Sequence, residues 1–373
     1  MDLETKICTL LSRAVLSKDM MMTVLEMLRN QREKIDYDRL LSLASYNQVT
    51  PIIHKHLEAA QDLPDTFVGR IRMQRIATLQ RSARQLTETL RVIGALHEGG
   101  MPVIPLKGPL MAETLLGDIS LYSSSDIDLL VRTSDIGKAI SNLENAGYRT
   151  VNAKSKSDVL AYWYNLALTG PEFTIELHWN ITVRYFPIDP DFWWEDAGEA
   201  TFQGRQFNSL SKEKLLISLV LNIFKHRFRP LKIFLPVQVL IGDTAIDWEK
   251  FLLDARRIRA ERLMVFCLQL MNDLFDIPLP GPITKKKIAG YDFLKRQVLK
   301  GLFAEQDRPY QHMLSFIFLL DSPAGIMRFL AGRTFPPVGE VRLRYNIPRR
   351  SPKVIIYYLL NPFIVLLGKP GRM

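Results

Sequence analysis

Hydrophobic residues recur every three or four positions over most of the chain, which is the spacing that places them on one face of an α-helix. In residues 84–100 this spacing is regular, and the closing pair Gly99 and Gly100 is typical of a helix end. The pattern predicts a helical region over residues 1–97. It returns after residue 206 and continues to about residue 330, most clearly in residues 212–226, 247–258 and 262–275.

The pattern changes between these two helical regions, where short apolar runs alternate with amphipathic segments. Three runs have the length and composition of β-strands, and they are residues 101–106, 126–131 and 173–183. A short helix is predicted to begin at Lys107-Gly108-Pro109, and a second over residues 134–147 with Ser134 or Asp135 as its cap. This order predicts an α+β fold, in which a small mixed β-sheet core is flanked by N-terminal and C-terminal helical regions.

The chain accordingly divides into four parts: an N-terminal helical region at residues 1–97, an α/β core at 98–205, a C-terminal helical region at 206–330 and a basic, apolar tail at 331–373. With 373 residues, 47% of them hydrophobic, it is long enough for two or three folded units. Cys8 and Cys267 are too far apart to indicate a disulfide framework or a zinc site. Because the N-terminus is acidic and lacks the pattern of a secretion signal, we expect a cytoplasmic protein.

The net charge of +10 is concentrated towards one end of the chain. Residues 328–373 contain nine basic residues and one acidic residue, Glu340, so they carry +8 and the remaining 327 residues carry only +2. A nucleic-acid enzyme more often spreads its positive charge along a groove. The sequence therefore gives no strong nucleic-acid signal, and a metal-dependent nuclease is disfavoured.

Residues 354–368 form an apolar run that Asn361 and Pro362 interrupt. The run is shorter than the roughly 20 residues that a membrane-spanning helix needs. We expect a final helix, broken at Pro362, that packs on the helical region. Peripheral contact with an anionic membrane is the alternative, because basic residues flank the run on both sides and its two tyrosines suit a membrane interface.

Two carboxylates, Asp126 and Asp128, stand one residue apart at the start of the second predicted strand. Since side chains alternate along a strand, both project from the same face, where their like charges require a neutralising partner. A pair of Mg²⁺ ions would supply it, because carboxylate oxygens suit this ion and phosphates often complete its coordination. The alternative is a solvated turn, in which Asp126 caps a backbone amide and Asp128 faces water.

Three further features favour a site for metal and phosphate over such a turn. Glu176 alternates with apolar neighbours in the third predicted strand, so it could join the aspartates as a third carboxylate. Lys107 and Gly108 lie at a strand-to-helix turn, where backbone amides could hold a phosphate. Ser124 and Ser125 offer hydroxyl groups directly before the first aspartate.

The aromatic residues of the third predicted strand have two interpretations. His178 would share the face of Glu176 if the strand is regular, so it is either a contact to phosphate or acceptor, or a structural histidine hydrogen-bonded beside the site. We expect Trp179 to belong to the core. His226, in a later basic segment, is left unassigned.

Together these residues resemble the nucleotidyltransferases of the polymerase-beta-like superfamily, and within it an uncharacterised bacterial nucleotidyltransferase family. Three motifs carry the similarity: Leu-Lys-Gly at residues 106–108, Asp-Ile-Asp-Leu-Leu-Val at 126–131 and Glu-Leu-His-Trp at 176–179. Flanking segments extend the resemblance over most of the chain. The sequence departs from the pattern in three places. Tyr122 stands where family members usually carry an arginine, and Pro109 stands where the superfamily usually has a serine. Residues 229–241 lack the aspartate that usually follows an Arg-Leu-like turn.

The resemblance implies an enzyme that uses Mg²⁺ to move a nucleoside monophosphate from an NTP to a hydroxyl group of an unidentified acceptor. It implies that Asp126, Asp128 and Glu176 are the catalytic residues and hold two Mg²⁺ ions, which Mn²⁺ could replace. The nucleotide-binding residues would be Lys107, Gly108, Ser124, Ser125 and His178. The departures leave a second interpretation open, in which the protein is a catalytically inactive binding or scaffold protein on the same fold.

Overall fold

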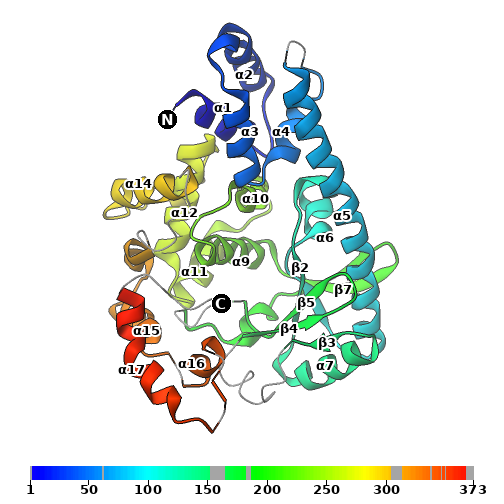
Figure 1. Cartoon of the computed structure of the whole chain (residues 1–373), viewed down its shortest axis with the longest axis vertical. Coiled ribbons are helices and arrows are strands. Elements are labelled where there is room, and N and C mark those ends of the chain that lie inside the picture. Colours follow the sequence, from blue (N-terminus) through cyan, green and yellow to red (C-terminus); the bar gives the residue numbers. More distant parts are fainter. Residues whose placement is uncertain are drawn as a thin grey trace.

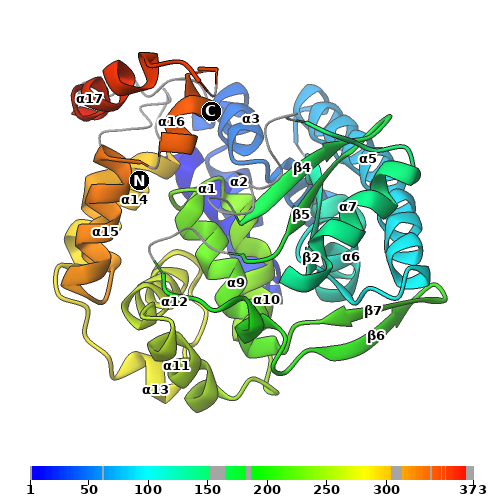
Figure 2. The same cartoon turned by 90° about the horizontal axis from the view of Figure 1, so that it is seen from below.

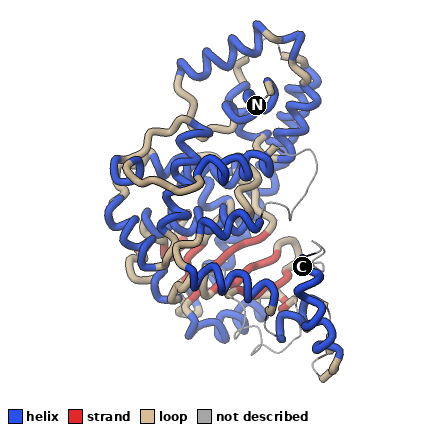
Figure 3. Tube along the Cα trace, turned by 90° about the vertical axis from the view of Figure 1, so that its left-hand side faces the viewer, coloured by secondary structure: helices blue, strands red, loops and turns tan. Residues whose placement is uncertain are grey.

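The structure, a computed structural model, describes residues 2–60, 63–151, 164–181, 186–303, 313–336, 338–345, 347–348 and 350–366. Helices make up most of it, and they surround a five-stranded mixed β-sheet and a two-stranded hairpin (Figure 1). The strands of the larger sheet form one layer between helices (Figure 3). The predicted α+β class, with a small mixed sheet flanked by helical regions, is confirmed.

Five helices form the N-terminal part of the chain: α1 (Leu3–Leu11), α2 (Lys18–Asn30), α3 (Tyr37–Tyr46), α4 (Thr50–Leu57) and α5 (Asp65–Glu98). The first three begin where sequence chemistry favours a helix start, because Asp2, Ser17 and Asp36 each accept a hydrogen bond from a backbone amide of the first turn. The 34-residue helix α5 then runs along the right edge of Figure 1 and connects these helices to the sheet.

The five-stranded sheet has the order β1-β2-β5-β4-β3. Its strands are β1 (Val103–Pro105), β2 (Asp126–Val131), β3 (Arg149–Thr150), β4 (Asn165–Thr169) and β5 (Thr174–His178). The two central strands, β2 and β5, are parallel, and the other neighbours are antiparallel. The three predicted strands are therefore present, although β1 and β5 are shorter than predicted. The hairpin of β6 (Gly198–Phe202) and β7 (Arg205–Ser209) was not predicted, and neither were β3 and β4.

The two faces of the sheet have different roles. One face carries Ile127, Leu129, Ile175 and Leu177, which pack with α5 and with α7 (Ile136–Asn145) in a single apolar cluster. The other face carries the acidic residues and His178 and is turned towards the helical region, because Leu130 and Ile104 on that side belong to the core of the helices. The alternation predicted for β2 and β5 thus separates a core face from a polar face.

The helix that follows β2 begins differently from the prediction. Asp135 occupies the N-cap position of α7, but its side chain makes no capping hydrogen bond. A 3₁₀ turn (Thr133–Asp135) leads directly into the helix and gives this segment helical backbone geometry, so the extended backbone that a side-chain cap requires is missing. The shorter helix predicted at Lys107-Gly108-Pro109 is α6 (Pro109–Met111), which continues as a π-helical turn (Ala112–Leu116).

The C-terminal part is again helical: α9 (Lys212–Lys225), α10 (Leu235–Ile241), α11 (Trp248–Arg257), α12 (Glu261–Phe275), α13 (Gly281–Thr284), α14 (Tyr291–Leu302), α15 (Pro323–Thr334), α16 (Val338–Arg344) and α17 (Lys353–Leu366). The three helices predicted most clearly correspond to α9, α11 and α12. Their buried side chains form one apolar cluster with those of α1, α3 and α4. Residues far apart in sequence therefore build the largest core, and the polar face of the sheet packs against it.

The tail lies apart from the sheet, on the opposite side of the molecule (Figures 1 and 2). The predicted final helix is α17, which packs on α15 and α16 and shares a small apolar cluster of Val341, Ile347 and Val354. The predicted break at Pro362 is wrong, because α17 continues through it. Asn361, one residue earlier, anchors this part of the helix by donating a hydrogen bond to the carbonyl of Thr334. Within the part of the chain that the structure describes, no helix is both long and apolar enough to cross a membrane.

Candidate metal and nucleotide site

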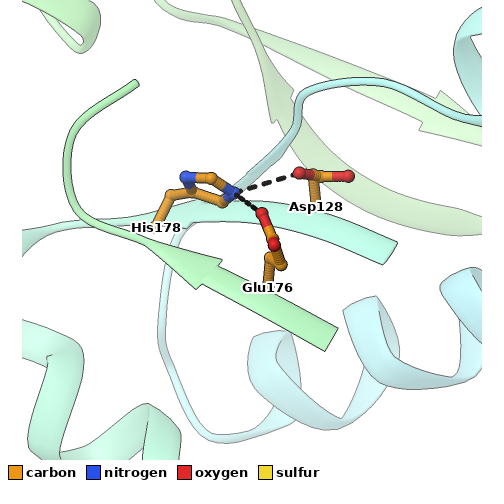
Figure 4. Close-up of side chains that lie close together, drawn as sticks. All are labelled: Asp128, Glu176 and His178. Carbon is orange, nitrogen blue, oxygen red and sulfur yellow. Dashed lines mark hydrogen bonds and ion pairs between the residues drawn. The ribbon is translucent and has the colours of Figure 1, made fainter. Parts of the chain in front are cut away.

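The parallel pairing of β2 and β5 places Asp128 directly opposite Glu176. Because paired residues of neighbouring strands project from the same face, both carboxylates point towards the helical region, and His178 follows two residues later on that face. His178 Nε2 lies 3.0 Å from Asp128 Oδ1 and 3.3 Å from Glu176 Oε2 (Figure 4). The three side chains offer ligand atoms that all lie within 4.8 Å of one another, which is the spacing of a metal site.

The surroundings of Asp128 fit a cation site. Its side chain is only 2% exposed, and those of His178 and Glu176 are 5% and 24% exposed. Asp128 Oδ2 is buried and has no hydrogen-bond partner among the residues that the structure describes. A buried carboxylate oxygen without a partner destabilises the folded state, and coordination of a divalent cation by that oxygen would remove this cost. The predicted alternative of a solvated turn is wrong for Asp128, which does not face water.

Two basic side chains, Lys107 and His178, pair with the carboxylates in this structure. Lys107 Nζ lies 3.2 Å from Asp128 Oδ1; burial disfavours its charge, but attraction to Asp128 and Asp126 outweighs that effect and raises its pKa. Burial likewise disfavours a charged His178, yet hydrogen bonds to Asp128 and Glu176 raise the pKa of its imidazole. The hydrogen bond from His178 lowers the pKa of Glu176 to about 2. The site is therefore a compact cluster of compensating charges.

Asp126 lies at the beginning of β2 and does not belong to this group of three. Its Oδ1 atom accepts hydrogen bonds from the hydroxyls of Ser124, at 3.2 Å, and Ser125, at 2.6 Å. Its backbone carbonyl accepts a hydrogen bond from Gln85 of α5. The structure thus brings Asp128, Glu176 and His178 together, and it places Asp126 beside them with the two serines as its partners. Trp179 is buried, as predicted.

The turn between β1 and α6 depends on Gly108. This residue has φ +101° and ψ −161°, a backbone conformation that only glycine adopts without strain. The amide of Leu106, just before it, donates a hydrogen bond to the carbonyl of Asp128, so the turn is tied to the acidic strand. The backbone conformation of Gly108 therefore helps to hold the side chain of Lys107 next to Asp128.

Replacing Gly108 with alanine is expected to destabilise the protein by about 2–3 kcal/mol and to weaken NTP binding. A new Cβ atom would have space, since its nearest neighbour is Ser124 Cβ at 3.9 Å, so the cost is one of backbone conformation. Gly117→Ala is the matched control: Gly117 has φ +64° in an ordinary left-handed turn, and the expected cost is about 1 kcal/mol. Urea unfolding and nucleotide titration measure both effects. Unchanged NTP affinity in folded Gly108→Ala would remove this turn from the nucleotide site.

A basic pocket lies at the C-terminal end of α9, and sequence analysis did not identify it. The pocket has a volume of about 370 Å³ and is lined by Tyr46, Gln48, Lys225, His226, Arg227, Arg229 and Pro230. Arg227 and Phe228 both have φ near +60°, an unusual backbone for two successive residues that are not glycine. Such strain is concentrated at functional sites, which supports a binding role for the loop that closes the pocket.

Lys232 connects this pocket to the acidic strand. Its ammonium group donates hydrogen bonds to Gln48, which lines the pocket, and to the carbonyl of Ser123, and it lies 5.1 Å from the ring centre of Tyr122. Burial lowers the pKa of Lys232 to about 8, and repulsion from Lys107 adds to the effect, while Asp126 opposes it. A lysine with such a pKa, close to a second lysine, is typical of a site prepared for an anion.

His226 and Lys225 lie side by side in the lining of the pocket, and Lys225 carries the positive charge of this pair. Burial, followed by repulsion from Lys107, Lys225 and Lys232, lowers the pKa of His226 to about 4. Attraction to Lys225 also contributes to the lowered pKa of Glu176, so the field of the pocket reaches the carboxylate group. The basic residues at 225–229 are the sequence signal for this pocket. On their own they do not predict a site, because their position relative to the acidic residues depends on the fold.

The polar face of the mixed sheet carries paired carboxylates on parallel central strands, with a basic pocket beside them, and these side chains could hold a metal ion and an anion. A comparison with protein-family models matches residues 33–276 to a family described as uncharacterised nucleotidyltransferase. The match covers more than half of the chain, and the chain belongs to this family. It includes every strand in the described part of the chain and the residues that line the basic pocket. No curated protein matches the chain.

Proposed function

We propose that the protein is a Mg²⁺-dependent nucleotidyltransferase that moves a nucleoside monophosphate from an NTP to a hydroxyl group of an acceptor. The observation that carries the proposal is the largely buried group of Asp128, Glu176 and His178 in a member of a nucleotidyltransferase family. Within the described part of the chain, the Oδ2 atom of Asp128 in this group has no hydrogen-bond partner. Carboxylate oxygens suit Mg²⁺, and the imidazole in the group is also compatible with Mn²⁺.

Each acidic residue has a role in this proposal. Asp128 and Glu176 would hold one ion, and Asp126 together with Asp128 would hold a second. The bound ions supply Lewis-acid activation of the acceptor hydroxyl and neutralise charge on the triphosphate. His178 donates to Asp128 and Glu176 and so fixes the orientation of both carboxylates. We therefore assign His178 a positioning role next to its ligands, with a direct contact to phosphate as the alternative that the sequence left open.

The basic pocket would bind the triphosphate. Lys232 and Lys225 bring positive charge to the side of the carboxylates where the phosphates would lie, and Lys107 and the Gly108 turn approach from β1. Ser124 and Ser125 would lie beside the phosphates, next to Asp126. Lys232 also lies over Tyr122, the position where related proteins usually carry an arginine. The ammonium group of Lys232 thus lies close to the position at which the family motif has an arginine.

Thermal unfolding in the presence of metal and nucleotide tests the proposal. Mg²⁺ or Mn²⁺ with the correct NTP is expected to raise the melting temperature, because a ligand at 100 times its Kd stabilises the folded state by about 2.7 kcal/mol. Either component alone should have a smaller effect. If no NTP stabilises the protein with either metal, the proposed nucleotide site is wrong.

Replacing Glu176 with glutamine is expected to weaken Mn²⁺ binding at least roughly tenfold. Removing a residue that only hydrogen-bonds to a metal ligand already lowers metal affinity about tenfold or more, and removing a ligand itself should lower it further. The Glu176 carboxyl group is only partly buried and accepts a hydrogen bond from Asn165. The amide oxygen of glutamine can accept the same hydrogen bond, so the fold should be retained. Asn165→Ala is the matched control, since it removes only this neighbour. Manganese titration followed by electron paramagnetic resonance measures the affinity. Equal affinity in Glu176→Gln and wild type would exclude Glu176 as a ligand.

One observation favours the alternative of an inactive binding protein. Lys107 and His178 already neutralise Asp128, so the group does not depend on a metal ion for charge balance. An inactive protein would be stabilised by NTP without metal and would release no pyrophosphate. An active enzyme requires both metal and NTP for full stabilisation and releases pyrophosphate when the acceptor is present.

A further inference from the structure

The last helix, α17, exposes five large apolar side chains. They are exposed by 47–65% and are Ile355, Ile356, Leu359, Leu360 and Phe363. Their spacing of one, three or four residues places all five on the same side of the helix. An isolated exposed leucine is ordinary, but a whole helix face of this kind is not.

The opposite side of α17 is packed, which fixes the orientation of the helix. Val354 lies in the small cluster with Val341 and Ile347, and the Tyr357 ring stacks on that of Tyr345 with 4.6 Å between their centres. Asn361 is fully buried and donates a hydrogen bond to the carbonyl of Thr334. These contacts hold one face of the helix on the protein. The five apolar side chains therefore point outwards because the other face is already occupied.

Exposed apolar side chains are concentrated in this part of the molecule. Of the eighteen large ones in the described residues, eight lie between residues 327 and 363. The three outside α17 are Met327, Phe335 and Val338, and the ring of Phe335 lies 6.1 Å from that of Tyr358 at the edge of the exposed face. Exposed apolar side chains concentrated in this way mark an interaction site.

The charge of the segment identifies the kind of partner. Residues 341–373 contain seven basic residues and no acidic residue. Arg350 and Lys353 are exposed at the beginning of α17. Two copies of such a face would bring like charges together with no carboxylate between them, so self-association is disfavoured. An apolar face with basic residues at its end matches a surface that is apolar inside and anionic at its boundary, which is an anionic lipid bilayer.

The length of the helix decides how it would lie. Fourteen residues span about 21 Å, which is shorter than the hydrocarbon core of a bilayer. We propose that α17 binds the surface of an anionic membrane, lying in the plane of the interface with its five apolar side chains inserted and its basic residues at the headgroups. The family match ends at residue 276, so this function would be carried by a part of the chain outside it.

Vesicle sedimentation with the full-length chain tests this proposal without nucleotide or metal, so the result does not depend on the proposed enzyme activity. The probes are vesicles of phosphatidylcholine alone and vesicles that also contain phosphatidylglycerol. Wild type is expected to bind the anionic vesicles at least about tenfold more strongly than the neutral ones, and high salt should release it. Similar binding to both vesicle types, or none to either, would overturn the proposal.

Three variants distinguish membrane binding by α17 from self-association and from a general effect of surface substitutions. Leu359→Asn with Phe363→Asn is expected to lower vesicle binding at least about tenfold while the melting temperature stays that of wild type, since both side chains are exposed. Arg350→Glu with Lys353→Glu should lower binding to anionic vesicles only. Leu253→Asn, on the exposed side of α11, is the matched control and should bind like wild type. If the α17 double variant binds vesicles like wild type, or only abolishes a dimer seen by sedimentation, the proposal is wrong.

Discussion

Asp128→Asn is expected to reduce nucleotidyl transfer by roughly three orders of magnitude, because a catalytic metal ion contributes several kcal/mol to the stabilisation of the transition state. The same change should destabilise the metal-free protein by about 3 kcal/mol, since it removes the negative charge with which two largely buried basic side chains pair. These are Lys107 and His178, whose nitrogen atoms lie 3.2 and 3.0 Å from Asp128 Oδ1. Transfer assays and urea unfolding in chelator measure the two effects.

Asp126→Asn is the matched control for the loss of a charge on the same strand. Asp126 is partly exposed and its partners are serine hydroxyls, which an amide oxygen also accepts, so its stability should change by less than about 0.5 kcal/mol. Its activity should still fall strongly, because the second ion loses a ligand. Wild-type transfer by folded Asp128→Asn would show that the acidic group is structural, whatever the result for Asp126.

Lys232→Met is expected to weaken NTP binding about tenfold or more, because the desolvated ammonium group would pair with phosphate oxygens. In wild type the affinity should fall as the pH rises through about 8. Below that pH Lys232 already carries its proton, whereas above it the free protein is neutral and binding must first take up a proton, which lowers the affinity by up to about tenfold per pH unit. In the variant this component of the pH dependence should be absent.

Stability measurements separate this binding role from a structural one. The pKa of Lys232 is lowered from 10.5 to about 8 in the folded protein, so the folded state binds fewer protons than the unfolded state between these values, and stability should rise with pH in that range. Lys232→Met removes a buried charge and also the hydrogen bonds to Gln48 and Ser123, so its net stability change should be within about 1 kcal/mol. A much larger loss with unchanged NTP affinity would assign Lys232 to the fold alone.

The polar face of the site followed from the sequence because strand alternation is a local property. Asp128, Glu176 and His178 each stand between two apolar residues, and this alternation places each of them on the face of its strand opposite to those neighbours. The register between the strands was not predictable in this way. The parallel pairing that sets Asp128 opposite Glu176 joins strands about 50 residues apart in sequence, and nothing local encodes it.

Other elements escaped prediction because their sequences are ambiguous. β6 and β7 are short and largely polar or exposed, so they have little apolar alternation to mark them. β4 ends at Thr169, directly before Gly170-Pro171, and its antiparallel pairing with β5 becomes clear only when both strands are seen together. The basic pocket is the largest omission: Lys225 and Lys232 lie about 100 residues from the acidic strand, and only the packing of the helical region on the polar face brings them to it.

The most direct test of the proposed function is the fate of the α-phosphate of an NTP. The protein, with Mg²⁺ and an NTP labelled either at the α-phosphate or at the γ-phosphate, is incubated with a cell extract that contains candidate acceptors, and Asp128→Asn serves as the control. Label from the α position, and none from the γ position, should appear in an acceptor with wild type and should be absent with the variant. Transfer of the γ label, or equal α labelling by wild type and Asp128→Asn, would contradict nucleotidyl transfer at the Asp128 and Glu176 site.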